Sequence, residues 1–371
     1  MDLSKCSCDK AGFCPVFRRD MDSKNHHWCK TTVEEKRIRY YEENVGKHKN
    51  NQLQKTEEKF YLPKQYSVPK NIEQVEIITF HFNPTGSKKL KETYYDFLSG
   101  LKNLAKYVKC YELVFDDSEP EIKNSKVIKG TLEKNCMWQK ESLMNVAIKE
   151  SNINDKKYVI WVDHDIIFDN PNWLVETISK LESGVDFIQP FVRVKYLSQD
   201  KLDIQSSSVS RVYVKKTNDT RNSRNSSGAP GAVWAARVES LSKISPLPNS
   251  FLGSGDEFLA FGLFEGDDWE RHHKLYNYEE KIKDAVEKHI VKTRSFNFSV
   301  DYIENNIFHL WHGDFTNRQY TTRYHIAKDN NIDLTKDIIV NDDGILEFVG
   351  SRAEHFSKLI YKFFENRKED G

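Results

Sequence analysis

Residues 158–168 read YVIWVDHDIIF, a stretch in which two aspartates interrupt an apolar run. Asp163 and Asp165 flank His164 directly after residues 158–162, whose apolar character predicts a buried strand. A buried carboxylate needs a counter-charge, and a divalent cation supplies one. The D-x-D pair can therefore hold a metal that bridges a diphosphate, or it can simply cap the turn that follows the strand.

The segment FHLWHGDF offers a histidine that could add a nitrogen ligand to such a metal. His309 and His312 lie three residues apart around a tryptophan. Imidazole is a good ligand for Mn²⁺ and a less typical one for Mg²⁺. The alternative is that these histidines only make structural hydrogen bonds.

An acidic pair stands between glycines in FLGSGDEFLAFGLF. Gly253 and Gly255 would let the backbone approach a ligand closely, and Asp256 or Glu257 could take the proton of an acceptor hydroxyl. Asp256 could instead serve as the N-cap of the helix predicted to follow.

Two arginines follow the histidines in NRQYTTR. The planar guanidinium groups of Arg318 and Arg323 suit diphosphate oxygens, but both residues could equally lie on the exposed surface of a helix. We expect surface coating for Arg323.

The first 30 residues hold a separate set of potential metal ligands. Four thiols and two imidazoles within 24 residues favour a tetrahedral zinc site over an iron–sulfur cluster or unliganded thiols. This module could contact the acceptor, including nucleic acid, or act as a structural clasp. The favoured ligands are Cys6, Cys8, Cys14 and Cys29, and His26 or His27 can replace one of them.

The elements that must position these residues alternate between strand and helix. Residues 75–82, 111–117 and 158–162 read as strands, and 90–108 and 140–151 as amphipathic helices. The apolar side of the first helix carries Tyr95, Leu98, Leu101, Leu104 and Ala105. This alternation predicts an α/β fold with a mostly parallel sheet. The polar stretch 198–230 is expected to be a mobile functional loop or disordered, and 352–370 an amphipathic helix.

Length and charge limit the alternatives. The 371 residues suggest one large domain or two. The 56 basic and 56 acidic side chains balance, so the chain has no net charge that would attract nucleic acid. No apolar run approaches the roughly 20 residues of a membrane span, and no signal peptide is evident, so a cytoplasmic protein is expected. The predicted organisation is a cysteine-rich module at 1–30, a charged linker at 31–70, a catalytic domain at 71–325 and a helical extension at 326–371.

The segment WVDHDIIF, preceded by MWQKESLMNVAI, resembles the nucleotide-sugar domain of glycosyltransferases with the GT-A fold, over about residues 75–312. That resemblance implies a Rossmann-like sheet with Asp165 as ligand of a Mn²⁺ or Mg²⁺ on the donor diphosphate. Asp163 would approach the ribose or the metal, and His312 matches a ligand from a C-terminal loop. His164 departs from the hydrophobic or acidic residue often found between the two aspartates.

The resemblance extends to further residues. It implies contacts of Phe80, Phe82, Asp116 and Asp117 with the base and ribose, and places Lys140 and Asn145 near the donor. Residues 228–237 would line the donor sugar and the acceptor, with Trp234 stacking on a sugar face or entering the core as part of a strand. For the catalytic base it favours Asp256 first and Glu257 second.

Together these features predict a metal-dependent glycosyltransferase that moves a sugar from a nucleoside-diphosphate sugar to a hydroxyl. The anomeric centre would be inverted if Asp256 lies opposite the leaving group. The acceptor could be a glycan, a protein or a modified nucleobase. Two alternatives are a sugar-nucleotide nucleotidyltransferase and a zinc-dependent nucleic-acid-binding protein with a degenerate catalytic fold.

Overall fold

The computed structural model describes residues 63–371, apart from 154, 225–226, 249, 265–268, 270–279, 321 and 334–335. Residues 61–371 form one compact unit. The predicted zinc ligands Cys6, Cys8, Cys14, Cys29 and His26 lie outside the described residues, so the zinc site stays a prediction.

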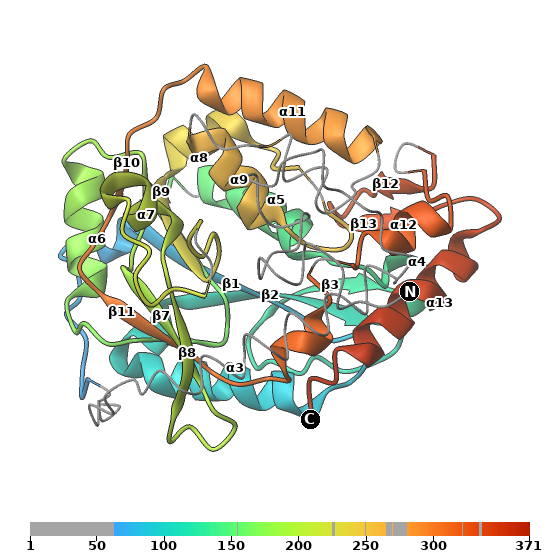
Figure 1. The fold of residues 1–371 in the computed structure, drawn as a ribbon, viewed down its shortest axis with the longest axis horizontal. Coiled ribbons are helices and arrows are strands. Elements are labelled where there is room, and N and C mark those ends of the chain that lie inside the picture. The colour runs from blue at the N-terminus through green and yellow to red at the C-terminus, as the bar shows by residue number, and fades with distance from the viewer. Residues whose placement is uncertain are drawn as a thin grey trace, which may run out of the picture. The chain divides into compact units, whose positions relative to one another are not determined.

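The centre of this unit is a seven-stranded sheet with the strand order β10-β6-β9-β4-β1-β2-β3 (Figure 1). β1 pairs in parallel with β2 and β4, β2 with β3, and β6 with β10. Only β9 pairs antiparallel with its neighbours in this sheet, so the predicted mostly parallel α/β sheet is confirmed. The strands are β1 (Val75–Phe82), β2 (Val108–Phe115), β3 (Lys126–Gly130), β4 (Tyr158–Val162), β6 (Phe187–Gln189), β9 (Val233–Arg237) and β10 (Val300–Tyr302).

Side chains of the central strands alternate between two apolar layers, one on each face of the sheet. In β1, Ile78 joins one buried cluster and Ile77 the other; in β4, Trp161 joins the first and Ile160 the second. Successive side chains of a strand point to opposite faces. Burial of both faces is therefore why β4 reads as an unbroken apolar run and why β1 is rich in apolar residues.

Helices cover both faces. α5 packs on β1 and β2, α8 packs on α5 and β9, and α6 packs on β6 and β9, while Figure 1 shows α3 and α5 on opposite sides of the sheet. No described helix is long and apolar enough to cross a membrane. The helices are α3 (Lys88–Leu101), α4 (Leu132–Asn135), α5 (Lys140–Ile153), α6 (Trp173–Glu182), α7 (Arg211–Thr217), α8 (Val238–Ile244), α9 (Gly255–Leu263), α11 (Glu280–Arg294), α12 (His325–Asp329) and α13 (Ala353–Asn366), with 3-10 turns η3 (Ile72–Gln74), η4 (Lys102–Tyr107) and η5 (Phe315–Arg318).

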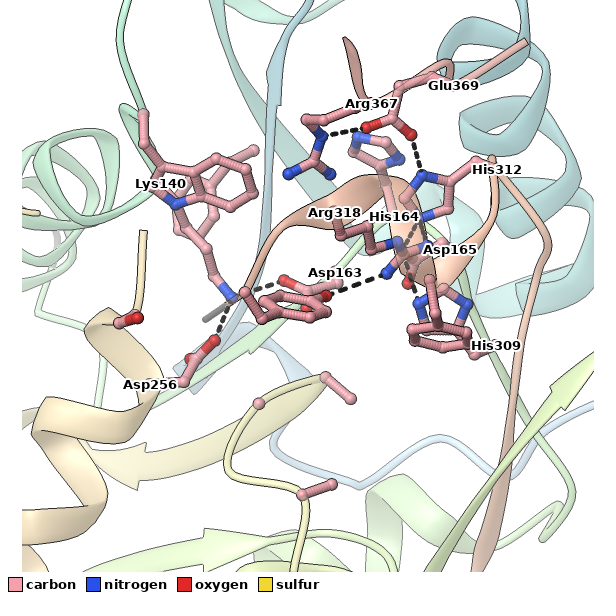
Figure 2. Close-up of a pocket in the computed structure, with 18 of the residues that line it drawn as sticks. Lys140, Asp163, His164, Asp165, Asp256, His309, His312, Arg318, Arg367 and Glu369 are labelled. Carbon is pink, nitrogen blue, oxygen red and sulfur yellow. Dashed lines mark hydrogen bonds and ion pairs between the residues drawn. The ribbon is translucent and has the colours of Figure 1, made fainter. Parts of the chain in front are cut away.

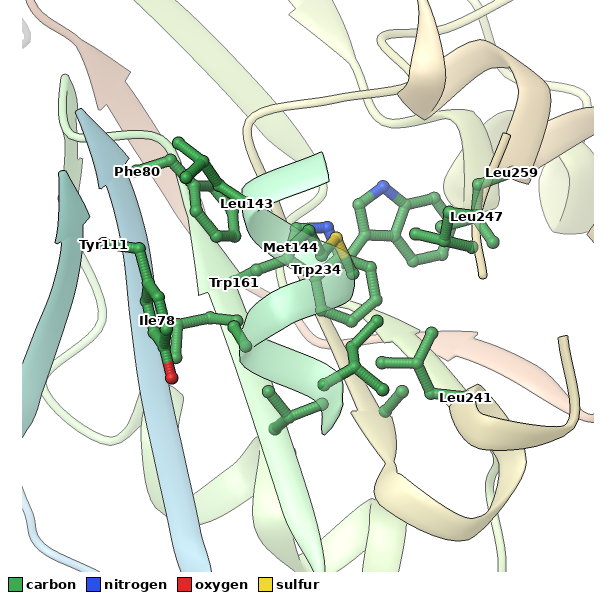
Figure 3. Close-up of a cluster of buried hydrophobic side chains, with 14 of the residues drawn as sticks. Ile78, Phe80, Tyr111, Leu143, Met144, Trp161, Trp234, Leu241, Leu247 and Leu259 are labelled. Atoms are coloured by element: carbon green, nitrogen blue, oxygen red, sulfur yellow. The ribbon is translucent and has the colours of Figure 1, made fainter. Parts of the chain in front are cut away.

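Figure 3 shows the apolar cluster beneath α5. Trp161 of β4 stacks on Trp234 of β9 with ring centroids 6.4 Å apart, and Leu143 and Met144 of α5 pack in the same cluster. Because α5 leads from the end of β3 back to the start of β4, its first residue, Lys140, lies at the carboxyl edge of the sheet.

A second, four-stranded sheet brings the distant histidines to the D-x-D segment. Its order is β5-β11-β7-β8, and β11 pairs antiparallel with β5 so that His309 lies opposite Ile166. The backbone N–H of Leu310 also donates to the carbonyl of Asp165 at 2.8 Å. The strands are β5 (Ile166–Phe168), β7 (Arg193–Leu197), β8 (Ile204–Val209) and β11 (Asn306–His309); β12 (Ile338–Val340) and β13 (Leu346–Phe348) form a separate pair.

The apolar side of α13 packs in a third cluster with residues of α4, α9 and β13. Its buried residues include Phe356, Ile360, Phe363 and Phe364, which confirms the amphipathic helix predicted for this segment. Beyond α13 the chain returns to the start of α3, where Asp370 Oδ1 accepts hydrogen bonds from Ser87 Oγ at 2.7 Å and from the backbone of Lys89 at 2.8 Å.

Two local predictions need correction. In the first helix and the turn after it, Leu101 and Leu104 are buried as expected, but Tyr95 is 42% exposed and Leu98 only partly buried, because the inward face of α3 also carries Tyr94 and Phe97. The polar stretch 198–230 contains β8 and α7 instead of an unstructured loop. β8 pairs with β7, so backbone hydrogen bonds order a segment whose side chains give little apolar signal.

Candidate functional site

A cavity of about 440 Å³ opens at the carboxyl edge of the sheet. Residues after β1 and β4 form one side, and the starts of α5 and α9 form another. The wall is completed by the chain before β9, the segment from His309 to Arg323, and residues that follow α13. Charged side chains in the wall are Lys140, Glu141, Asp163, Asp165, Arg224, Asp256, Glu257, Arg318, Arg323, Arg367 and Glu369.

Asp165, His309 and His312 form a compact group in this wall, which we term the metal cluster (Figure 2). One ligand atom from each lies within 4.8 Å of the others. Asp165 Oδ2 is 2.9 Å from His312 Nε2 and 3.4 Å from His309 Nε2, and Asp165 is 8% exposed. A carboxylate with two imidazoles is a donor set that Mn²⁺ and similar ions accept.

Hydrogen bonds to the opposite ring nitrogens indicate the tautomers of both histidines. His309 Nδ1 lies 2.7 Å from the carbonyl of Leu310, and His312 Nδ1 lies 2.5 Å from Glu369 Oε2. Both oxygens only accept, so each Nδ1 carries a proton and each neutral ring keeps a lone pair on Nε2. Two lone pairs therefore face the carboxylate oxygen of Asp165.

Arg318 reinforces this reading for His312. Its Nη2 lies 3.0 Å from His312 Nε2, and a guanidinium can only donate. His312 Nε2 must then accept, which leaves two acceptors, Nε2 and Asp165 Oδ2, 2.9 Å apart. The second oxygen of Asp165 is buried and has no hydrogen-bond partner among the described residues. A cation between these atoms would resolve the conflict, so the residues present fit a divalent metal.

The acid–base state of the cluster agrees with this reading. Burial lowers the pKa of His309 to about 4, although the negative charge of Asp165 opposes the shift. Burial disfavours the charge of Asp165, but His309 and His312 outweigh it and lower the pKa of this carboxyl. At neutral pH the cluster thus contains a carboxylate and a neutral His309, the forms that bind metals.

Lys140 joins two carboxylates at the other end of the cavity, an arrangement we term the lysine bridge (Figure 2). Its Nζ lies 2.7 Å from Asp163 Oδ1 and 2.8 Å from Asp256 Oδ2. Burial works against the charge of Lys140, but the two carboxylates outweigh it and raise its pKa. Burial also raises the pKa of Asp163, against the attraction of Lys140. Asp163 is therefore paired with Lys140 and lies outside the metal cluster. The third member of that cluster, with Asp165 and His312, is His309.

Asp256 and Glu257 occupy the first turn of α9 with different partners. Asp256 Oδ2 accepts from Lys140, and a Cβ at Gly231 would lie only 2.7 Å from that oxygen, so a larger residue there would displace the carboxylate. Glu257 accepts from the buried Arg211 at 2.7 Å. Ser254, not Asp256, occupies the N-cap position, so the acid is not used to cap the helix.

Of the other residues predicted to bind the nucleotide-sugar donor, some line the cavity and some lie away from it. Phe80 and Phe82 line the cavity. Asp116 and Asp117 are exposed beyond the end of β2 and outside the cavity wall, and Asp116 Oδ1 accepts from the backbone of Leu132.

Asn145 and Trp234 also lie away from the cavity wall. The side-chain amide of Asn145 accepts from the backbone N–H of Leu247 at 2.8 Å and donates to its carbonyl at 3.1 Å. The amide of Asn145 therefore holds a loop in place. Trp234 is fully buried and donates to the carbonyl of Pro230. Its core position corresponds to the alternative in which residues 233–237 enter the core as a strand.

Several residues of the cavity were not predicted from the sequence. Glu369, Arg367 and Glu141 carried no motif, and His309 was recognised only as a neighbour of His312. Arg323, expected on the surface, is 4% exposed and lines the cavity, because the turn that precedes α12 directs it inward. The spacing of FHLWH was the one signal that could have identified His309.

Comparisons with known proteins give a fold likeness at low similarity. No protein-family model matches the chain, and no curated protein matches it. Glucosyl-3-phosphoglycerate synthase from Mycobacterium tuberculosis, solved with Mn²⁺, UDP and phosphoglyceric acid, is 10% identical, with 62% of this chain and 68% of that chain covered and a TM-score of 0.32. CMP:2-keto-3-deoxy-manno-octonic acid synthetase, solved with CTP, is also 10% identical, with 62% and 90% covered and a TM-score of 0.32. At these values the likeness carries no conclusion about the reaction.

Proposed function

We propose that this protein is a metal-dependent glycosyltransferase that moves a sugar from a nucleoside-diphosphate sugar to an acceptor hydroxyl. The observation that carries the proposal is the metal cluster, where Asp165 Oδ2 meets the lone pairs of His309 and His312 in the wall of the cavity. Imidazole ligands favour Mn²⁺ over Mg²⁺.

Asp165, His309 and His312 would hold the ion, and Glu369 orients His312 through its Nδ1 proton. When bound, a divalent cation offsets the negative charge that develops on a diphosphate leaving group. Arg318, in contact with His312, would present its planar fork to the same diphosphate oxygens.

Contacts to the rest of the donor come from the neighbouring strand ends. Phe80 and Phe82, among the last residues of β1, line the cavity and offer apolar surface to a base. Asp163 has one oxygen engaged by Lys140, and we assign the other to a ribose hydroxyl and not to the metal.

Asp256 is the proposed base, because Glu257 is engaged by Arg211. Only Oδ2 of Asp256 has a hydrogen-bond partner among the described side chains, so Oδ1 is left to receive a proton. The acceptor hydroxyl gives its proton to Asp256, its oxygen bonds to the anomeric carbon, and the bond from that carbon to the diphosphate breaks. If Asp256 and the diphosphate lie on opposite faces of the sugar, the anomeric centre is inverted.

The test is a screen of nucleotide sugars against the full chain. Thermal unfolding and sugar release are measured with and without Mn²⁺, beside Asp165→Asn and the control Asp343→Asn, an exposed acid of the β12–β13 turn. We expect Mn²⁺-dependent stabilisation and hydrolysis by at least one nucleotide sugar. Asp165→Asn should lose roughly a hundredfold or more of the hydrolysis, and Asp343→Asn none.

Two other outcomes would replace the proposal. Turnover of a nucleoside triphosphate with a sugar phosphate, with release of pyrophosphate, would identify a nucleotidyltransferase. Binding of DNA or RNA without any response to nucleotide sugars would favour the nucleic-acid-binding alternative.

A further inference from the structure

Arg323 is a buried cation in the cavity wall, on the turn between η5 and α12. Its Nη2 donates to Ser254 Oγ, and its guanidinium lies 5.3 and 5.5 Å from the ring centroids of Tyr320 and Tyr324. A hydroxyl and two rings carry no net negative charge. These contacts position the guanidinium without neutralising it.

Two other cations of the cavity have acidic partners. Lys140 contacts two carboxylates, and Arg367 donates to Glu369 at 2.5 Å. Within the described part of the chain, Arg323 forms no ion pair with a carboxylate, and its buried Nε has no hydrogen-bond partner. An unpaired buried charge is costly, so a site that keeps one is suited to an anionic ligand.

Glu141 does not supply the missing charge. It interacts electrostatically with Arg323, but burial raises the pKa of Glu141 to about 8. Near neutral pH this carboxyl is therefore largely protonated.

The position of Arg323 assigns it to the acceptor side of the cavity. Its partner Ser254 immediately precedes α9, whose first turn carries Asp256. A Cβ at Gly253, where φ is +87°, would lie 3.0 Å from Arg323 Nη1, so the backbone approaches the guanidinium closely. Arg318, in contrast, contacts His312 at the metal cluster.

The start of α9 adds to the positive potential beside Arg323. Ser254 makes no side-chain capping hydrogen bond, and the positive end of the helix dipole points toward this part of the cavity.

We propose that Arg323, Ser254 and the first turn of α9 form a subsite for an anionic group, carboxylate or phosphate, of the sugar acceptor. This inference rests on the proposed function, because it uses Asp256 as the base that marks the acceptor side. It narrows the acceptor class to hydroxyl compounds with a negative charge near the reacting hydroxyl.

The experiment measures equilibrium binding of two kinds of probe to the full chain. Glucose, glucose 6-phosphate and glucuronate report on the anion subsite and separate phosphate from carboxylate. UDP, GDP, ADP and CDP, each with Mn²⁺, report on the donor side. The variants are Arg323→Gln, the charge-conserving Arg323→Lys, and Arg318→Gln as the matched control at the metal cluster; unfolding curves check that each variant is folded.

We expect at least one anionic probe to bind more tightly than glucose. Arg323→Gln should weaken that probe roughly tenfold to a hundredfold, with Arg323→Lys in between. The affinity for the nucleoside diphosphate should stay the same in Arg323→Gln and fall in Arg318→Gln.

Two results would overturn the inference and leave the proposed function standing. In one, Arg323→Gln binds the anionic probes as tightly as the wild type. In the other, it weakens the nucleoside diphosphate by the same factor, which would assign Arg323 to the donor. If no nucleoside diphosphate binds with Mn²⁺, the proposed function fails and the acceptor assignment is overturned with it, whether or not the anions bind.

Discussion

The metal cluster and the lysine bridge reach electrostatic balance in different ways. At the lysine bridge the chain supplies both signs of charge, since the ammonium of Lys140 lies within 2.8 Å of Asp163 and Asp256. At the metal cluster, Asp165 Oδ2 and two imidazole lone pairs converge, and Arg318 donates to only one of these three acceptors, His312 Nε2. The bridge is thus complete as the chain folds, whereas the cluster is complete only with a cation.

Removal of the charge of Lys140 should have the largest effect on stability. Lys140→Met leaves Asp163 and Asp256 facing each other without a counter-charge. Breaking a buried ion pair costs several kcal/mol, but the side chain of Asp163 is 33% exposed, so we expect a loss of about 2 kcal/mol at neutral pH. Urea unfolding measured without metal would give this value.

Lys140→Arg is the matched control, because it keeps the charge, and it should recover most of the loss. Added Mn²⁺ should not restore Lys140→Met, since its proposed ligands lie at the other end of the cavity. If Lys140→Met unfolds at the same urea concentration as the wild type, the lysine bridge contributes no net stability and the contrast between the two ends is wrong.

Local features of the fold were predictable from the sequence because they depend on neighbouring residues. The apolar-rich segment of β1 and the apolar run of β4 predicted both strands, and the aspartates emerge where β4 ends. The inward face of α3 was predicted only in part, because Tyr94, Tyr95 and Phe97 offer two possible apolar stripes and only tertiary packing selects between them.

The partners within the site were not predictable in the same way. Asp165 meets His312 across 147 residues, and Lys140 meets Asp256 across 116. Glu369 reaches His312 only because α13 packs beside α4 and returns the chain to the cavity. Such contacts depend on topology, which no local period or motif encodes.

Glu369→Gln should weaken the metal cluster without touching the lysine bridge. The amide can still accept from His312 Nδ1, but it carries no negative charge to increase the basicity of Nε2. Changes to such outer partners weaken metal binding by about tenfold or more. We expect about a tenfold increase in the dissociation constant of Mn²⁺, measured from free Mn²⁺ by electron paramagnetic resonance.

Arg367→Gln controls for the ion pair that Glu369 also makes, since it breaks that pair and leaves the contact with His312. Its Mn²⁺ affinity should fall less than that of Glu369→Gln. Equal losses in the two variants would mean that the tail after α13 matters for packing and not for orientation of His312.

The smallest effect concerns Glu141, which is buried beside the lysine bridge. Burial raises its pKa from 4.5 to about 8. Between these values the unfolded chain releases a proton that the folded chain retains, so the free energy of unfolding falls as pH rises. The contribution is about 1 kcal/mol between pH 6 and pH 7.

Glu141→Gln cannot ionise, and groups common to both proteins cancel in the difference. We therefore expect the variant to gain stability relative to the wild type by that amount per pH unit in urea unfolding at pH 6 and 7. A difference that does not change with pH would show that Glu141 ionises normally, and that the lysine bridge does not exclude water from its surroundings.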